Sequence, residues 1–319
     1  LGGITAAAPV CYFNGISFLS SGNPSWICSG NVIGGTASGS LKNLSTSATK
    51  TAGIIAESSV SPVLNCTGNT IRNIESGTAG SSFNIGTFGM YFSVIGGSVT
   101  ASGNTIHSVK GTNASQQARV SGIATYAGTV SVMKNIIHSL GVANNLSLVK
   151  GLDSFAPAGM FVNNMISLGR DSSGTSVSSG CQIFGIHDWT SSVSKYYFNS
   201  VLVSGTAADG GANTLALYST ATGNREYVNN ILMNSRINSG STGKHYSIQV
   251  EGTSPNPPGL ICNYNDLYVS GTGTVLGRFN NADVSGLAAW KTLTGKDTNS
   301  ISGNPRFAGI TDLRIDSSA

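Results

Sequence analysis

The chain has 319 residues with a net charge of +4, and charged side chains make up only 9% of it, against roughly 25% in an average soluble domain. Its basic residues form no cluster of the kind that a phosphate backbone requires, so nucleic acid is not expected as a partner. No stretch approaches the ~20 consecutive apolar residues of a membrane-spanning helix. Abundant Gly, Ser, Thr and Asn disfavour helices, while 39% hydrophobic residues in short, regular runs disfavour disorder. We therefore predict an all-β protein with many short strands.

A short unit, apolar-x-x-Asn-x-apolar, recurs along the chain. Its copies lie 29 to 38 residues apart, which is a period typical of repeat architectures. An earlier copy around Asn14 lies 17 residues before the first full one, which is a short distance for a complete turn. The eight full copies carry the following asparagines: Asn31, Asn69, Asn104, Asn135, Asn164, Asn199, Asn230 and Asn265.

Each unit contains two further apolar stretches. A Gly followed by an apolar residue, as in Gly53-Ile54 and Gly122-Ile123, forms one of them, and the other precedes the Asn. Three short strands per unit, separated by turn residues, predict one coil of a right-handed parallel β-helix. We expect about eight to nine such coils over residues 1–286, stacked around one continuous core.

The periodic Asn has a physical reason to recur. Asn tolerates left-handed backbone angles and can bond neighbouring backbone groups, so it suits a bend between two strands. Stacked coils place equivalent side chains ~4.8 Å apart, so each amide can bond the next one. The fixed offset of the Asn from its apolar neighbours favours such a ladder over a simple turn marker.

The repeat pattern resembles the pectate-lyase-like superfamily of right-handed parallel β-helices, whose coils often carry an inward Asn ladder. Enzymes of that superfamily gather acidic residues on one face, whereas the 13 acidic residues here are mostly isolated. The paired Asp-Asp, Gly-His-Gly and Arg-Ile-Lys signatures of polygalacturonases do not occur. The resemblance therefore implies the fold, and no catalytic residue is carried over from it.

The last part of the chain has a more specific likeness. Leu287-Ala-Ala-Trp290-Lys-Thr-Leu293, followed by Asn304-Pro305-Arg-Phe307, is similar to the closing segment of large secreted β-helix proteins from Bacteroidetes-type bacteria. That likeness implies a surface-exposed protein exported by a type IX system. We take residues 287–319 as a helix and closing segment of the same solenoid.

The predicted helix covers residues 287–293. Ser285 is expected to cap its start and Gly295 to end it. Leu287, Trp290 and Leu293 fall on one face, so the helix could cover a flank or an end of the solenoid.

Four of the five cysteines, Cys11, Cys28, Cys66 and Cys262, occupy the third place before the Asn of the unit. Other units have apolar residues there, so this place is expected to face the core, where Cys acts as a small hydrophobe. Neighbouring coils would bring Cys28 and Cys66 within reach of a disulfide, although we favour free thiols. Whether the two are bonded stays open.

One small constellation offers candidate chemistry. Aligning Gly151-Leu152-Asp153 with Gly185-Ile186-His187-Asp188 puts Asp153 beside His187 on adjacent coils, followed by Asp188 and Trp189. The functional interpretation is a glycan-binding or acid/base site with an aromatic platform. The simpler one is a hydrogen-bonded pair on the solvent face, since perturbed pairs are often structural.

A second stack contains Arg72, His107, His138 and Ser167, each one place after the second apolar residue of the unit. Two His side chains ~4.8 Å apart could share a metal ion, but no third ligand aligns with them. A polar outer ladder is the better interpretation, and the sequence indicates neither a metal nor a cofactor.

These observations favour a non-enzymatic, extracellular β-solenoid that acts as a bacterial surface stalk, filament subunit or adhesin segment. The alternative is a polysaccharide lyase or hydrolase, or a glycan-binding module, that uses the β-helix face around Asp153, His187 and Asp188. Expected partners are a second copy joined head to tail or neighbouring segments of a longer chain, and also glycans. Localisation is expected to be extracellular or at the cell surface.

Overall fold

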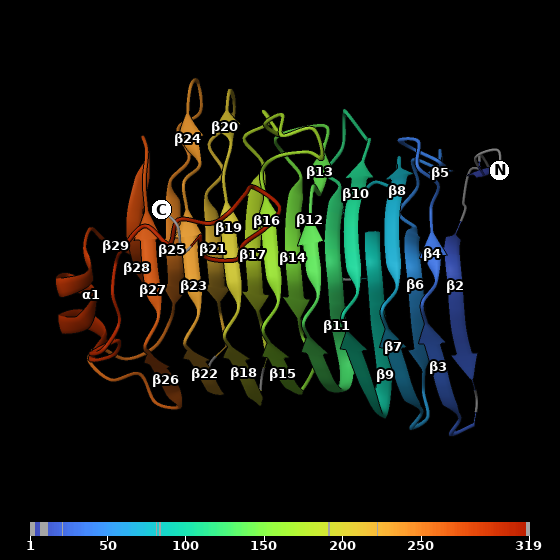
Figure 1. Cartoon of the computed structure of the whole chain (residues 1–319), viewed down its shortest axis with the longest axis horizontal. Coiled ribbons are helices and arrows are strands. Elements are labelled where there is room, and N and C mark those ends of the chain that lie inside the picture. Colours follow the sequence, from blue (N-terminus) through green and yellow to red (C-terminus); the bar gives the residue numbers. More distant parts are fainter. Residues whose placement is uncertain are drawn as a thin grey trace.

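The chain forms a parallel β-helix of about seven turns, nearly all strand with one short helix, as a computed structural model shows (Figure 1). The structure describes residues 4–6, 12–20, 22–80, 82, 84–190, 192–221 and 223–316. Successive turns run from the N-terminal end to the C-terminal end along one axis. This confirms the predicted fold, which is consistent with the right-handed form, with slightly fewer turns than the eight to nine expected.

Within the described residues, one side of the solenoid is an 11-stranded sheet, which we call the ladder sheet. Its strands pair in parallel with the equivalent strand of the next turn. In chain order they are β1 (Ile4–Ala6), β4 (Val32–Ile33), β5 (Leu41–Asn43), β8 (Thr70–Ser76), β10 (Thr105–Gly111), β12 (Ile136–His138), β13 (Gly141–Val142), β16 (Met165–Leu168), β19 (Ser200–Val203), β23 (Ile231–Asn234) and β27 (Asp266–Val269).

A 16-stranded sheet, counted over the same residues, makes the other two sides, and the long strands β9 (Gly86–Ser102) and β11 (Arg119–Met133) pair on both. The first side, the pocket face, also contains β2 (Phe13–Ser20), β6 (Lys50–Ser58), β14 (Leu148–Ser154), β17 (Gln182–Asp188), β21 (Thr214–Ser219), β25 (His245–Val250), β28 (Thr274–Phe279) and β29 (Ala282–Val284). The second, the lower side, contains β3 (Ser25–Ser29), β7 (Val63–Thr67), β15 (Ala158–Val162), β18 (Val193–Tyr197), β22 (Asn224–Val228) and β26 (Leu260–Asn263). A small pair, β20 (Thr206–Ala207) and β24 (Ile237–Asn238), stands apart.

The predicted Asn ladder is present and runs without a break from Asn31 to Asn265. At each rung the side-chain amide and the backbone N–H donate to the next side-chain oxygen; from Asn135 to Asn164 these distances are 2.9 Å and 3.1 Å. The amide of Asn135 also donates to the Ala101 carbonyl at 2.9 Å. Every buried rung therefore satisfies backbone groups as well as its neighbour.

The left-handed bend lies one residue earlier than the sequence suggested. The residue before the rung Asn has the positive φ, for example 56° at Lys134, 55° at Phe198 and 58° at Tyr264. Gly takes this place in the first three units, where left-handed angles cost least. The Asn at each rung therefore contributes through its hydrogen bonds and not through a left-handed backbone angle.

A column of glycines on the pocket face is explained by packing across the core. A Cβ on Gly122 would lie 2.5 Å from Ile137 Cγ2 and 2.7 Å from the carbonyl oxygen of Gly151, so no larger side chain fits. Three turns later the equivalent places hold Ala216 and Leu232, which are aligned by the strand registers. Where Ala216 replaces the glycine, the side chain facing it is Leu232, which branches at Cγ. Ile137 branches at Cβ and leaves no room for the added methyl group.

The early copy of the unit around Asn14 is not a rung, in keeping with its short distance from Asn31. Asn14 lies in β2 and pairs with Ala52, while Ile16 pairs with Ile54 of the pocket face. Gly15-Ile16 is therefore the Gly-apolar landmark of the first turn, and Asn31 belongs to that same turn. The two motifs look alike because both place an apolar residue two positions after the Asn.

The C-terminal helix α1 spans Leu287–Thr294 and confirms the predicted element. Its N-cap is Gly286, without a side-chain hydrogen bond, so the expected cap at Ser285 was wrong. Gly295 ends the helix with a left-handed φ of 64°, as predicted. Leu287 and Leu293 pack against the core beside the fully buried Trp290.

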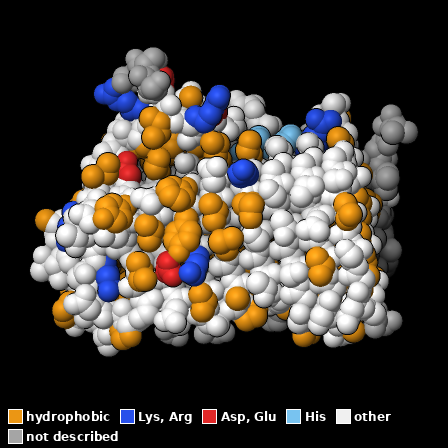
Figure 2. All heavy atoms as spheres, turned by 60° about the horizontal axis from the view of Figure 1, so that its bottom comes forward, with side chains coloured by type: hydrophobic (Ala, Val, Ile, Leu, Met, Phe, Trp, Pro, Cys, Tyr) orange, Lys and Arg blue, Asp and Glu red, His pale blue; other side chains and the backbone are white. Residues whose placement is uncertain are grey.

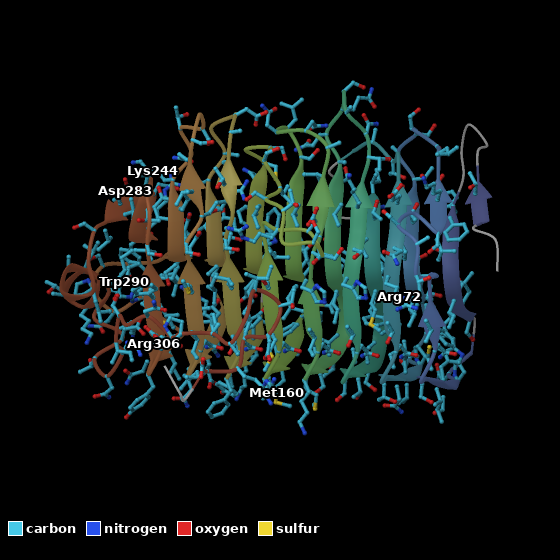
Figure 3. The ribbon with its side chains drawn as sticks, turned by 45° about the horizontal axis from the view of Figure 1, so that its top comes forward. Arg72, Met160, Lys244, Asp283, Trp290 and Arg306 are labelled. Atoms are coloured by element: carbon cyan, nitrogen blue, oxygen red, sulfur yellow. The ribbon has the colours of Figure 1, made fainter. Side chains whose placement is uncertain are left out.

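Helix α1 lies beyond the last strands and covers the C-terminal end of the core, with Trp290 at that end (Figures 1 and 3). The indole ring packs on Gly277, where a Cβ would come within 2.6 Å of it. The ladder ends at the same place, because Asn265 donates to Asp297 at 3.0 Å instead of to another Asn. Its backbone N–H donates to Ser300 at 2.8 Å.

The segment after residue 301 turns back along the outside of the ladder sheet, across β16 and β19 (Figure 1). Ser167 Oγ donates to the carbonyl oxygen of Ile310 there. A short antiparallel bridge joins Phe307 and Ile315. This closing segment therefore covers a flank, while α1 covers the end.

The lower side is sparsely charged, and hydrophobic side chains are scattered among small polar ones over it (Figure 2). Ile261 is exposed in β26, and Met160 is partly exposed in β15. Lys195 and Glu226 form an ion pair of 3.2 Å between β18 and β22. The low content of charged residues in the sequence therefore leaves most of the lower side uncharged.

Candidate functional site

Asp153 and His187 lie side by side on the outer side of the pocket face, as the spacing predicted. They are register partners in β14 and β17. Their side chains meet, with His187 Nδ1 2.8 Å from Asp153 Oδ1. Both are buried, at 1% and 3% exposure, so the pair is not the solvent-exposed one that the simpler interpretation assumed.

Three more side chains surround the Asp153 carboxylate. Lys150 Nζ donates to Oδ1 at 3.1 Å, and the Tyr126 hydroxyl donates to Oδ2 at 3.2 Å. The Arg119 guanidinium forms an ion pair with the same oxygen. We call Arg119, Lys150, Asp153 and His187 the polar cluster.

Asp188 does not join this cluster, although it is the next residue after His187. Alternation along β17 turns its side chain inward, where it is fully buried. Its Oδ2 accepts hydrogen bonds from the Tyr227 hydroxyl at 2.6 Å and from Ser194 at 2.7 Å. Asp188 therefore stabilises the interior between β17, β18 and β22, away from any ligand at the outer surface.

Burial sets the electrostatics of the polar cluster. Burial and, secondly, the charge of Arg119 lower the pKa of Lys150 to about 6. Burial, followed by the charges of Lys150 and Arg119, holds the pKa of His187 well below its usual value. Both shifts favour the uncharged amine and the uncharged imidazole beside the ion pair of Arg119 with Asp153.

A pocket of about 460 Å³ opens over the cluster. Arg119, Lys150 and His187 reach its wall from three adjacent turns, whereas Asp153 stays beneath them. Trp189 and Tyr218 form aromatic parts of the rim. The volume lies in the range of small-molecule sites, about 300–1,000 Å³. The remaining lining residues are Ser82, Leu148, Phe155, Gln182 and Phe184.

Aromatic rings form a continuous row beside the pocket, one from each of four successive turns. The aromatic row consists of Tyr91, Tyr126, Phe155 and Trp189, with successive ring centroids 5.0, 5.2 and 4.7 Å apart. Exposure increases along the row, from buried Tyr91 to Trp189, which is 53% exposed. Tyr218 adds a ring on the next turn, 5.3 Å from His187.

The second candidate group, on the ladder sheet, has the predicted order Arg72, His107, His138 and Ser167. The two imidazole rings stack with centroids 5.0 Å apart and an interplanar angle of 1°. Each Nδ1 meets the hydroxyl of the following residue, Ser108 at 3.0 Å and Ser139 at 2.8 Å.

Both imidazoles of this stack are kept neutral at pH 7. Burial lowers the pKa of His138 to about 4, and burial also lowers that of His107. Over the part of the chain that the structure describes, no three His, Cys, Asp or Glu side chains gather in a way that could hold a metal ion.

The sequence missed Arg119, Lys150 and the aromatic row. Lys150 lies three residues before Asp153 on the same strand. Strand pairing places Ser121 opposite Lys150, and Arg119 lies two residues before Ser121. Phe155 and Trp189 each follow directly after a strand of the pocket face. The available signal was an aromatic residue at one register position of three consecutive units, Tyr126, Phe155 and Trp189, which the unequal turn lengths obscure; Tyr91 pairs with Ala124 and lies outside that register.

No family model, curated protein or solved structure matches this chain. Among the described residues, no helix has both the length and the apolar character needed to cross a membrane. The site must therefore be interpreted from its own geometry.

Proposed function

We propose that the protein is an extracellular, adhesive β-solenoid of a bacterial surface that binds glycans on its pocket face. The aromatic row beside the lined pocket is the observation that carries this proposal. Its rings are spaced by the strand separation, which is comparable with the length of one sugar residue in an extended chain. A glycan running along the solenoid axis can therefore place successive sugars over successive rings.

The chemistry of the pocket suits a sugar ligand. Aromatic faces pack on the apolar C–H face of a sugar and exclude water there. The half-exposed Trp189 and the adjacent Tyr218 supply such faces. Gln182, Lys150 and His187 supply polar groups in the wall that can hydrogen-bond hydroxyl groups. The combination of an aromatic rim and a few fixed polar groups is typical of small-ligand sites.

The rest of the solenoid supports a structural role for the scaffold. The unbroken ladder and the covered C-terminal end fix the position of every turn, so the pocket face is rigid. A rigid scaffold holds several weak sugar contacts in register, and simultaneous contacts raise the total affinity. Adhesion through many modest contacts needs no catalytic group.

The test is a panel of neutral and uronic-acid oligosaccharides titrated against the wild type and Trp189→Ala. We expect binding to at least one class, weakened about fivefold or more by loss of the exposed ring. Phe198→Ala, which removes another exposed aromatic ring at a bend next to the lower side, is the matched control and should leave binding unchanged. If no oligosaccharide binds, or if both variants weaken binding equally, the proposal fails.

A second candidate function, a polysaccharide lyase, is favoured by one observation. Lys150 is an amine with its pKa lowered to about 6 at the wall of the pocket, and an uncharged amine can accept a proton as a general base. Formation of unsaturated products by the wild type, abolished in Lys150→Met, would establish this activity and displace the purely adhesive function. The adhesive function predicts binding without turnover.

Self-association is a separate proposal, and the fold limits where it can occur. In the described part of the chain, β2, β3 and β4 each pair on one side only, with β6, β7 and β8. The C-terminal end is covered by α1. Sedimentation at micromolar concentration, with and without residues 1–10, tests it. We expect association through the N-terminal edge, and monomers in both cases would exclude it.

A further inference from the structure

Most of the first turn of the solenoid is held on one side only: among its described strands, β5 alone pairs outward, with β1. Its strands β2, β3 and β4 pair with the second turn, and no other described strand pairs with their outer edges. Terminal turns of this kind open more readily than interior ones because fewer contacts must be broken. A covalent link between the first and second turns would therefore stabilise the part of the solenoid that most needs it.

Cys28 and Cys66 lie at the same position of these two turns. They are register partners in β3 and β7 and both face the core, with 3% and 0% exposure. Neighbouring strands are ~4.8 Å apart, which falls within the Cα separation of about 4.4–6.8 Å that disulfides span. The third turn has Ala101 at this position, so the cysteine pair is confined to the N-terminal edge.

The two thiols are free in this structure. The Cys28 thiol donates a hydrogen bond to Asn69 Oδ1 at 3.7 Å, and the neighbouring thiol is the largest influence on each group: Cys66 lowers the pKa of Cys28, and Cys28 raises that of Cys66. The Asn31 amide donates a further hydrogen bond to Cys28 Sγ at 3.4 Å. Cys28, on the terminal turn, is therefore the thiol that loses its proton more readily, with Cys66 as its register partner.

We propose that Cys28 and Cys66 form a disulfide in an oxidising environment, and that this bond clamps the first turn to the second. With oxidised glutathione as oxidant, Cys28 thiolate attacks one glutathione sulfur and releases one glutathione thiolate. Cys66 then loses its proton and attacks the Cys28 sulfur, which releases the second glutathione. Two protein thiols are oxidised, one glutathione disulfide is reduced, and the protons go to the two leaving thiolates. The proposal does not depend on glycan binding.

The test uses the full chain with Cys11→Ser, because Cys11 lies outside the described residues and could compete for either thiol. The protein is unfolded, refolded in a mixture of oxidised and reduced glutathione, alkylated and digested with trypsin. We expect a reducible link between the fragments 1–42 and 51–72, which contain Cys28 and Cys66, in most of the protein. Proteolytic cleavage within the first turn should slow by about tenfold compared with the reduced protein.

Matched variants separate the clamp from general oxidation. Adding Cys28→Ser or Cys66→Ser should remove the linked fragment and the slower cleavage, whereas Cys262→Ser, at the equivalent place of a distant turn, should preserve both. Two alkylated thiols at Cys28 and Cys66 after oxidative refolding would overturn the proposal. A stable glutathione adduct on Cys28 would overturn it as well, because it would show that Cys66 cannot reach the Cys28 sulfur.

Discussion

The indole Nε1 of Trp290 donates a hydrogen bond to Asp297 Oδ2 at 2.9 Å. The other oxygen of that carboxylate accepts from Asn265, the last rung of the ladder. The side chain that covers the end of the core is thus tied to the group that ends the ladder. One short segment therefore closes both the apolar and the polar part of the solenoid.

Trp290→Ala should destabilise the protein by about 3–5 kcal/mol, because it removes a fully buried aromatic side chain and opens the core at Gly277. Trp290→Phe keeps most of the ring and loses only the bond to Asp297, so its cost should be smaller. Denaturant unfolding measures both. Equal, small losses in the two variants would show that α1 does not close the core.

Asn135→Ala should cost about 1–3 kcal/mol, because it leaves the neighbouring rung and the Ala101 carbonyl without their partner. Gln117→Ala in an exposed loop is the control and should stay within about 0.5 kcal/mol of the wild type. A loss at Asn135 no larger than at Gln117 would mean that the ladder adds nothing to stability.

Gly122→Ala should destabilise by about 1–3 kcal/mol, because the added methyl group overlaps Ile137 and the Gly151 carbonyl. The chain itself combines Ala216 with Leu232 at the equivalent places. Adding Ile137→Leu to Gly122→Ala should therefore recover part of the loss. A double-mutant cycle measures the coupling, and strictly additive effects would contradict this packing explanation.

Lys150 should make stability depend on pH above neutrality. Its pKa is lowered to about 6 in the folded protein, whereas in the unfolded chain the amine keeps its proton to about pH 10. Between these values the unfolded state binds one more proton, so stability rises with pH by up to about 1.4 kcal/mol per unit. Below the folded pKa both states are protonated and this dependence ends.

Lys150→Met should flatten the increase in unfolding free energy between pH 6.5 and 8. Lys110→Met, at an exposed position of β10, should keep the wild-type slope. The comparison is made by denaturant unfolding at several pH values. An unchanged slope in Lys150→Met would show that the buried amine stays charged.

The fold was predictable because the period of the Asn units directly reflects the stacking of turns. Asn31 and its equivalents keep a fixed offset from apolar residues whatever the loop lengths, and the structure places each one on a rung. The copy at Asn14 lies only 17 residues before Asn31, and it resembles the unit because a Gly-apolar strand can match its pattern by chance. Only strand pairing, Asn14 with Ala52, distinguishes the two.

The site was predictable only in part. The pairing of Asp153 with His187 follows from the aligned Gly-apolar landmarks. The inward turn of Asp188 and the arrival of Arg119 from the preceding turn depend on side-chain direction, which the motif does not encode. The burial of the polar cluster could not be predicted from the sequence either, because the burial of Asp153 depends on side chains from several turns.

The central claim, that a glycan lies along the aromatic row, is tested most directly by isothermal titration with one oligosaccharide series of increasing length. The rings of Tyr126, Phe155 and Trp189 come from successive turns, so affinity should rise with each added sugar up to about three residues and then level off. Phe155→Ala should weaken the longer oligosaccharides most. Affinity that is independent of length, and unaffected by Phe155→Ala, would contradict the account.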